Sequence, residues 1–530
     1  MMRHKQPTQL AATLCFGVFG LVLVGCGRQV ASDANMRANA LATDGAPLGM
    51  RQNGIETGVA LNTEAYDSVK ENPFHSALEQ PQSTFSVDVD TASYANVRRL
   101  LTDGQRPPAG AVRIEELINY FDYEYPQPNG PHPFSVTTEL ATCPWQPKHQ
   151  LLRVGLQGQA VDFTNRAPCN LVFLLDVSGS MHSARKLPLV QSAMKMLTEE
   201  LRPNDRIAIA VYAGASGLVL PSTPVSRSAE ILQAIDQLQA GGATNGAAGI
   251  QLAYQTAEEN FVSEGINRVI LCTDGDFNVG TTSQSELVDL VQQKAKSNVF
   301  LTVLGFGSGN LKDSTMEKLA DKGNGNYGYI DSMLEARKVL VEEIGGTLMT
   351  IAKDVKIQLD FNPMHVQAYR LIGYENRVME NQDFRDDSKD AGEIGAGHSV
   401  TALYEIVPAG ADGVGDGERK SEFVNKQVSS SADHATQLTV NVRYKRPDEE
   451  AVQEFQVRVA GSRDLREPSL DFQFVSAVAG YGMLLRGSEF AGAASWDWVI
   501  ETADASLGSD ERGVRAEFLR LAKTARRVSM

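Results

Sequence analysis

The periodicity of apolar positions changes twice along the chain. Residues 134–141 and 151–156 alternate apolar with polar side chains, which is typical of half-buried antiparallel strands. The strand-like run that begins at Asn170 is continuously apolar from residue 171 to residue 175, and from there to about residue 350 strand-like runs alternate with helical periods. This order predicts a parallel sheet that is covered by helices on both faces. From Val355 onward the alternation of period two returns.

The returning alternation predicts a second architecture. Four segments alternate cleanly, and we expect them to form an antiparallel β-sandwich: residues 355–361, 399–406, 437–444 and 452–459. We expect the strands before Asn170 to join this sandwich, so that the α/β domain is inserted between its strands. One long helix is expected at residues 333–351, and further helices at residues 469–485, 496–505 and 511–526.

These patterns predict an α/β fold class, with a doubly wound parallel sheet inserted into a sandwich and with helical parts at both ends. Six consecutive parts are expected: a signal peptide at residues 1–25, a flexible tether at 26–80, an N-terminal helix and strand region at 81–166, the α/β domain at 167–350, the antiparallel β-domain at 351–460 and a C-terminal helical region at 461–530.

The N-terminus has the features of an export signal. Arg3 and Lys5 precede an apolar run at residues 10–24, which is too short to span a membrane comfortably. The run ends in Leu-Val-Gly-Cys, and this resembles the lipobox of bacterial lipoproteins, which implies that Cys26 becomes an acylated first residue. Several acyl chains would anchor the protein stably. The alternative is an uncleaved signal anchor. Gly27 implies, by the same family analogy, the outer membrane of a Gram-negative cell.

Composition narrows the choice of partners. The formal net charge is -16. Because nucleic acids and anionic lipid surfaces attract basic proteins, this acidity argues against both as partners.

Five cysteines make no disulfide framework. Cys15 would leave with the signal peptide, and Cys272 lies in an apolar run that predicts a core position. An exported protein can form disulfides, so a bridge between Cys143 and Cys169 is a possible pairing.

Candidate chemistry is concentrated in the α/β domain. Asp176, Ser178 and Ser180 follow the apolar run in a D-x-S-x-S pattern, Thr244 lies in a Gly-rich loop, and Asp274 ends a second apolar strand. Ligands bind at the carboxyl ends of strands in such sheets. Two carboxylates and three hydroxyls suit Mg²⁺ or Mn²⁺ and are poor for zinc. The charge left on a divalent ion would favour a further acidic ligand from a partner.

At these residues the chain resembles the von Willebrand factor type A domain with its metal-ion-dependent adhesion site. The resemblance covers residues 167–350 and all five motif positions. It implies that Ser178, Ser180 and Thr244 contact the ion, and that Asp176 and Asp274 act directly or through water. Segments 85–94, 273–280 and 479–486 resemble a family of bacterial lipoproteins that carry this domain between an N-terminal region and a C-terminal domain of unknown function.

Other candidate sites are weaker. Asp88 and Asp90 could bind Ca²⁺, but a solvated strand face and a helix cap are the commoner explanation. The glycines of residues 305–309 suggest a nucleotide loop, but the spacing fits a strand-to-helix turn better.

The sequence therefore predicts a non-enzymatic, lipid-anchored protein of the cell envelope. It would bind a protein partner through a metal-bridged carboxylate, and the membrane through its acylated N-terminus. The alternative is a metal-dependent hydrolase, or a subunit of an envelope protease or assembly complex, with Asp276 as general base.

Overall fold

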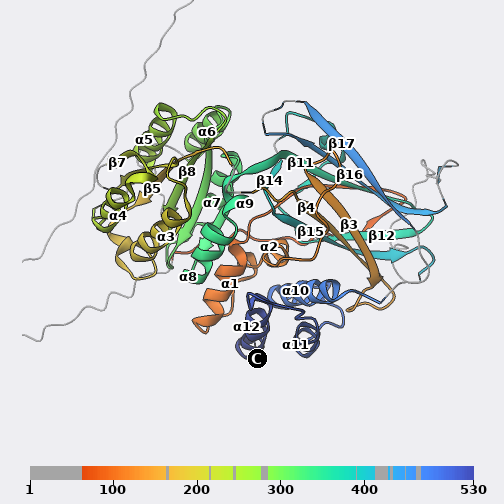
Figure 1. Cartoon of the computed structure of the whole chain (residues 1–530). Coiled ribbons are helices and arrows are strands. Elements are labelled where there is room, and N and C mark those ends of the chain that lie inside the picture. Colours follow the sequence, from red (N-terminus) through yellow and green to blue (C-terminus); the bar gives the residue numbers. More distant parts are fainter. Residues whose placement is uncertain are drawn as a thin grey trace, which may run out of the picture. The chain divides into compact units, whose positions relative to one another are not determined.

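The structure is a computed structural model. It describes residues 63–162, 166–213, 216–242, 246–275, 284–389, 391–411, 428–429, 434–447, 449, 451–460 and 467–529. The described residues all belong to one compact unit, shown in Figure 1. The predicted signal peptide, the predicted acylation site Cys26 and the predicted tether as far as residue 62 lie outside the described residues.

A six-stranded sheet forms the centre of the α/β domain. Its order is β10-β9-β8-β5-β6-β7, with β7 antiparallel to β6 and the other neighbours parallel. The strands are β5 (Cys169–Asp176), β6 (Arg206–Tyr212), β7 (Ser216–Pro224), β8 (Ile266–Thr273), β9 (Phe300–Phe306) and β10 (Tyr327–Ile330). The continuous apolar run of β5 is explained by burial on both faces, because every one of its residues is buried.

Helices cover both faces of this sheet (Figure 1). Leu171, Phe173 and Leu175 of β5 pack against one group of helices: α3 (Leu187–Glu200), α4 (Ser228–Asp236) and α8 (Met333–Arg337). The intervening Val172 and Leu174 pack against the other group: α5 (Gly246–Glu259), α6 (Gln284–Ala295) and α7 (Asp313–Lys322). The doubly wound sheet is therefore confirmed.

The α/β domain is inserted into an antiparallel sandwich, as predicted. One sheet has the order β1-β12-β15-β4-β3 and the other β13-β2-β11-β16-β17, with β14 also paired to β11. Strands before the insertion are β1 (His75–Ser76), β2 (Gln82–Ser86), β3 (Phe134–Thr142) and β4 (Gln150–Gly158). Strands after it are β11 (Thr350–Phe361), β12 (Val366–Ile372), β13 (Val378–Met379), β14 (Gly392–Gly395), β15 (Ser399–Pro408), β16 (Thr436–Lys445) and β17 (Val452–Ala460). Ile357 pairs with Phe85, and Leu403 pairs with Arg153, across the insertion.

Helices from both ends of the chain share one core. These helices are α1 (Ala92–Thr102), α2 (Ile114–Asn119), α10 (Leu470–Arg486), α11 (Trp496–Ala505) and α12 (Val514–Ser529). Phe121 packs edge-on against Phe474 and Phe518, with ring centroids 5.0 and 5.6 Å away. The described part of the chain contains no helix long and apolar enough to cross a membrane.

Two expectations were wrong. The long helix at 333–351 is broken into α8, a π-helical turn at Lys338–Glu342 and α9 (Ile344–Leu348). After this break the backbone packs closely against His398. A Cβ atom at Gly346 would lie 1.9 Å from Nε2 of His398. Cys143 and Cys169 do not pair; both are free and buried, and burial raises the pKa of each thiol.

Candidate metal centre

Two buried carboxylates lie at the ends of neighbouring parallel strands. Asp176 is the last residue of β5, and Asp274 directly follows β8. The two strands pair in register, with Leu175 opposite Cys272, so that both carboxylates reach the same edge of the sheet. Asp176 is 0% exposed and Asp274 is 1% exposed. The parallel strand ends thus bring together acids that are far apart in the sequence.

The loop after β5 holds the two serines beside Asp176. The amide of Ser178 donates to Oδ1 of Asp176 at 2.8 Å, and the hydroxyls of Ser178 and Ser180 lie 3.0 Å apart. Ser178 is buried, whereas Ser180 is exposed. We call Asp176, Ser178, Ser180 and Asp274 the strand-end site. It is enclosed on the side of the carboxylates and reaches solvent at Ser180.

A glycine-rich loop is bonded to this serine loop. The amide of Gly179 donates to the carbonyl of Gly242 at 3.1 Å, and the amide of Gly241 donates to the carbonyl of Val177 at 2.7 Å. Gly242 has φ +93°, a conformation that glycine adopts readily. Thr244, the fifth predicted ligand, is two residues further on and lies outside the described residues. The backbone that leads to it is anchored against the site.

Asp274 has two partners that the sequence did not indicate. Nζ of Lys186 lies 2.8 Å from its Oδ2, and Nδ2 of Asn310 donates to the same oxygen at 3.2 Å. The only signal for Lys186 was its place just before a helix that follows the D-x-S-x-S loop. That position allows many orientations of a long side chain, so the ion pair required the structure.

The electrostatics of the strand-end site favour a cation. Burial is the main cause that raises the pKa of Asp176, to about 6, and the charge of Asp274 adds to it. Hydrogen bonds from Ser178 and from the hydroxyl of Tyr212, at 3.3 Å, act in the opposite direction. Two buried carboxylates and two hydroxyls form a donor set that fits a hard divalent ion such as Mg²⁺. Asp276, the general base of the hydrolase alternative, lies outside the described residues.

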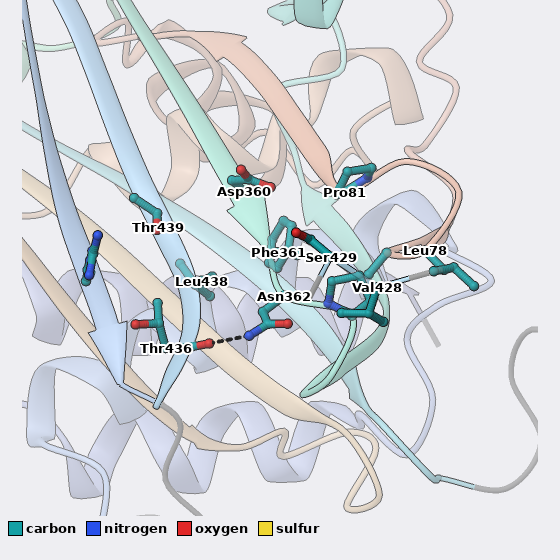
Figure 2. A pocket seen from close by; sticks show the side chains of 13 residues that line it. Leu78, Pro81, Asp360, Phe361, Asn362, Val428, Ser429, Thr436, Leu438 and Thr439 are labelled. Atoms are coloured by element: carbon teal, nitrogen blue, oxygen red, sulfur yellow. Dashed lines mark hydrogen bonds between the residues drawn. The ribbon is translucent and has the colours of Figure 1, made fainter. Parts of the chain in front are cut away.

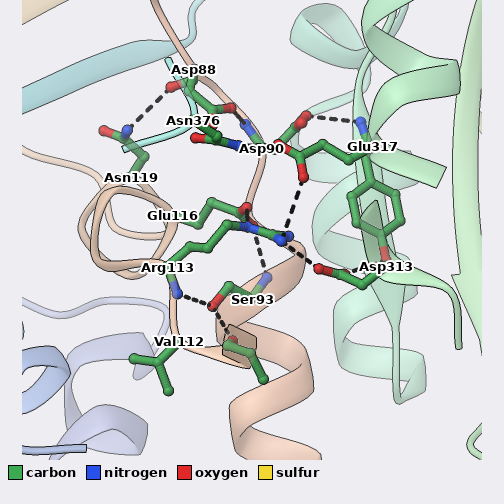
Figure 3. Close-up of polar contacts among 12 residues, drawn as sticks. Asp88, Asp90, Ser93, Val112, Arg113, Glu116, Asn119, Asp313, Glu317 and Asn376 are labelled. Atoms are coloured by element: carbon green, nitrogen blue, oxygen red, sulfur yellow. Dashed lines mark hydrogen bonds and ion pairs between the residues drawn. The ribbon is translucent and has the colours of Figure 1, made fainter. Parts of the chain in front are cut away.

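A second group of carboxylates lies between the N-terminal region and α7 (Figure 3). Oxygens of Asp88, Glu116 and Glu317 all lie within 4.8 Å of one another, and all three residues are buried. Arg113 pairs with Glu116 and Asp313. We define the acidic cluster as six residues: Asp88, Asp90, Glu116, Asp313, Glu317 and Asp321.

A second arginine, Arg377, also binds the acidic cluster. Its guanidinium lies 3.2 Å from Asp88, 3.2 Å from Glu317 and 2.8 Å from Asp321. Burial and the neighbouring acids raise the pKa of Glu116 to about 8, although Arg113 opposes the shift.

The sequence placed Asp88 and Asp90 wrongly. A solvated strand face and a helix cap were expected, yet the two residues are 3% and 4% exposed. Asp90 accepts a hydrogen bond from the amide of Tyr327 at 2.8 Å, and Thr91 is the residue before α1. Buried arginine partners from distant segments make this burial possible, because they supply the opposite charge.

A cavity lies at the edge of the sandwich (Figure 2). Its volume is about 430 Å³, and its lining includes Pro81, Asp360, Phe361, Asn362 and Leu438. Nδ2 of Asn362 donates to the carbonyl of Thr436 at 2.8 Å beside it. No predicted ligand lines this cavity, so it adds nothing to the metal centre.

Comparison with known proteins gives three family matches. The von Willebrand factor type A domain model matches residues 170–342. The model of the C-terminal part of the uncharacterized protein YfbK matches residues 346–528, and a von Willebrand factor model matches residues 60–153.

The chain is also similar to individual proteins. The uncharacterized protein YfbK of Escherichia coli strain K12 is 43% identical over 470 residues, which are 87% of this chain and 81% of that protein. The uncharacterized protein sll0103 of Synechocystis is 30% identical over 185 residues, 35% of this chain and 43% of that protein. A solved von Willebrand factor type A structure from Catenulispora acidiphila is 16% identical and covers 73% of this chain and 90% of its own, with a TM-score of 0.43.

Proposed function

Because this chain belongs to the family that joins a von Willebrand factor type A domain to a YfbK-type C-terminal domain, we propose that it is a metal-dependent binding protein. Domains of the von Willebrand factor type A often mediate interactions between proteins. In this proposal the strand-end site binds Mg²⁺ or Mn²⁺ and engages an acidic group of a protein partner. The chain acts by binding and not by catalysis.

One observation carries the proposal. Asp176 and Asp274 are buried acids at adjacent strand ends, and the exposed hydroxyl of Ser180 lies 3.0 Å from that of Ser178. Only two of the ligands are anionic, so their charge does no more than balance that of a divalent ion, and the ion can still accept an acidic ligand from outside. Thr244 would complete the ligand set. The exposed side at Ser180 is where a carboxylate of the partner would approach.

The metal site is tested by calorimetry with MgCl₂. Asp176→Asn keeps the size of the side chain and removes its charge, so we expect it to abolish Mg²⁺ binding. Asp236→Asn is the matched control, because Asp236 is an exposed acid on α4 that pairs with Lys195. At a free ion concentration of about 100 Kd, Mg²⁺ should stabilise the parent by about 2.7 kcal/mol. If Asp176→Asn takes up Mg²⁺ as the parent does, the assignment fails.

The partner is tested by capture. The full-length chain should retain an envelope protein from detergent-solubilised membranes, and EDTA should release it. The Asp176→Asn variant should retain none of it. Phosphatase and peptidase substrates should remain unhydrolysed with Mg²⁺ present; turnover that Asp276→Ala abolishes would instead support the hydrolase alternative.

We also propose a lipid anchor at Cys26 and a location at the cell envelope, in the outer membrane if the cell is Gram-negative. The basic start, the apolar run and the Leu-Val-Gly-Cys sequence support this proposal. Cells fed a labelled fatty acid should label the parent, and Cys26→Ser should lose the label and leave the membrane fraction. A labelled Cys26→Ser protein would refute acylation at this residue.

A further inference from the structure

The ammonium of Lys186 already neutralises one carboxylate of the strand-end site. Its Nζ lies 2.8 Å from Oδ2 of Asp274, and the two side chains are 8% and 0% exposed. Asn310 donates to the same oxygen at 3.2 Å. Because a buried carboxylate without a counter-ion is costly, this pair compensates Asp274 when no metal is bound.

Packing fixes the position of this lysine. Lys186 directly precedes α3, and its carbonyl accepts a hydrogen bond from the amide of Val190 at 3.0 Å. Its aliphatic stem lies on the backbone of Gly307, where a Cβ atom would be 2.3 Å from Cγ and 2.5 Å from Cε of the lysine. Gly307 has φ +78°, so glycine is favoured there for conformation as well as for space. The ammonium is therefore held at Asp274 by its own stem as well as by charge.

We propose that Lys186 is an internal counter-ion that competes with the divalent ion for Asp274 and thereby weakens metal binding. This inference rests on the proposed function, because it concerns the affinity of the same site. A divalent ion bound by Asp274 must share that carboxylate with the ammonium or displace it. Like charges on one carboxylate repel each other, and a compact ammonium is a point charge that can be exchanged for an ion.

The competition has two linked consequences. Removing the charge of Lys186 should tighten Mg²⁺ binding, and we expect at least a tenfold lower Kd, equivalent to about 1.4 kcal/mol. The same change should lower the melting temperature in EDTA, because it removes the positive charge of Lys186 from beside the buried Asp274. Saturating Mg²⁺ should then raise the melting temperature of the variant more than that of the parent. A lysine that only filled space would not link these two effects.

The test compares the full-length parent with Lys186→Met and Lys186→Gln by calorimetry with MgCl₂ and by thermal unfolding in EDTA and in Mg²⁺. Lys186→Gln keeps a hydrogen-bond donor without the charge, and serves if Lys186→Met does not fold. Lys195→Met is the matched control, because Lys195 lies on the same helix and pairs with Asp236 at the surface. Its Kd for Mg²⁺ should equal that of the parent.

The outcomes separate this inference from the proposed function. A lower Kd for Mg²⁺ in the Lys186 variants, together with a lower melting temperature in EDTA, supports the competition. A result in which the variants bind Mg²⁺ and the parent does not would support it as well. An equal or higher Kd in the variants overturns the competition and leaves the metal site standing. If neither the parent nor any Lys186 variant binds Mg²⁺, the metal site itself is refuted and the competition falls with it.

Discussion

The strand-end site and the acidic cluster both bury carboxylates, but they neutralise them differently. Asp274 faces a lysine, whose compact ammonium forms an ion pair with that one carboxylate. The acidic cluster faces Arg113 and Arg377, whose planar guanidinium groups each contact several acids at once. A single ammonium can be replaced by an ion without breaking other contacts. A guanidinium with several partners ties together the segments that supply them.

The difference also appears in what each group of acids connects. The strand-end site lies within the α/β domain and reaches solvent at Ser180. The acidic cluster joins three segments: residues 88–90 after β2, helix α2, and helix α7 of the α/β domain. Burial of charge can therefore serve binding at one place and attachment of a domain at another. The cation that accompanies the acids distinguishes the two uses.

The largest effect on stability is expected from removing an arginine that pairs with the acidic cluster. Arg377→Met would leave the buried Asp88 and Glu317 and the half-buried Asp321 without the arginine that they share. Loss of one partner of a buried ion pair costs about 3–5 kcal/mol, so the free energy of unfolding in urea should fall by that amount.

Arg385→Met provides the control for this prediction. Arg385 is 74% exposed and pairs with Glu454 at the surface, so its loss should change stability by less than about 1 kcal/mol. If Arg377→Met and Arg385→Met lose the same free energy of unfolding, Arg377 does not hold the segments of the acidic cluster together. Mg²⁺ binding at the strand-end site should survive in Arg377→Met at a temperature where the variant is folded.

An intermediate effect is expected from pH. The pKa of Glu116 is raised from 4.5 to about 8, mainly by burial, so the folded protein holds a proton that the unfolded chain releases. Stabilisation from this group is complete below about pH 4.5 and is lost as pH rises through about 8. The proton is shared among neighbouring carboxylates, so the slope should stay below about 1.4 kcal/mol per pH unit.

Urea unfolding between pH 5.5 and 8.5 measures this slope. Glu116→Gln cannot ionise, so its stability should depend less on pH than that of the parent over this range. Glu454→Gln is the surface control and should keep the slope of the parent. Parallel curves for the parent and Glu116→Gln would show that Glu116 does not hold the proton.

The sequence predicted the features that follow from the order of strands and helices along the chain. Alternating strands and helices indicate a parallel sheet, and the carboxyl ends of its strands must share an edge, which brings Asp176 and Asp274 together. Gly241 and Gly242, which precede Thr244 in the sequence, could also be assigned to a loop near the serines. The position of Thr244 itself and the bound ion remain predictions.

The remaining features depend on partners that no local pattern indicates. Lys186 and Asp274 are 88 residues apart, and Arg377 is 289 residues from Asp88. Alternation placed Asp88 opposite Phe85 and Val87 on the strand, and so on a solvated face, but a buried arginine from the other side of the insertion overrides that pattern. Contacts between residues far apart in the sequence are the part that periodicity could not provide.

The smallest effect is expected from salt, and it separates the two regions most cleanly. Screening shortens from about 10 Å at 0.1 M to about 3 Å at 1 M ionic strength, and it acts on charges that reach solvent. Raising NaCl from 0.1 to 1 M should weaken Mg²⁺ binding at the strand-end site by a few fold, because the ion enters from solvent beside Ser180. The stability difference between the parent and Arg377→Met should change by less than about 0.5 kcal/mol over the same range, since that guanidinium is buried among its acids. A difference that shrinks with salt would mean that water reaches the acidic cluster, and the contrast between an exchangeable lysine and a fixed arginine would then be lost.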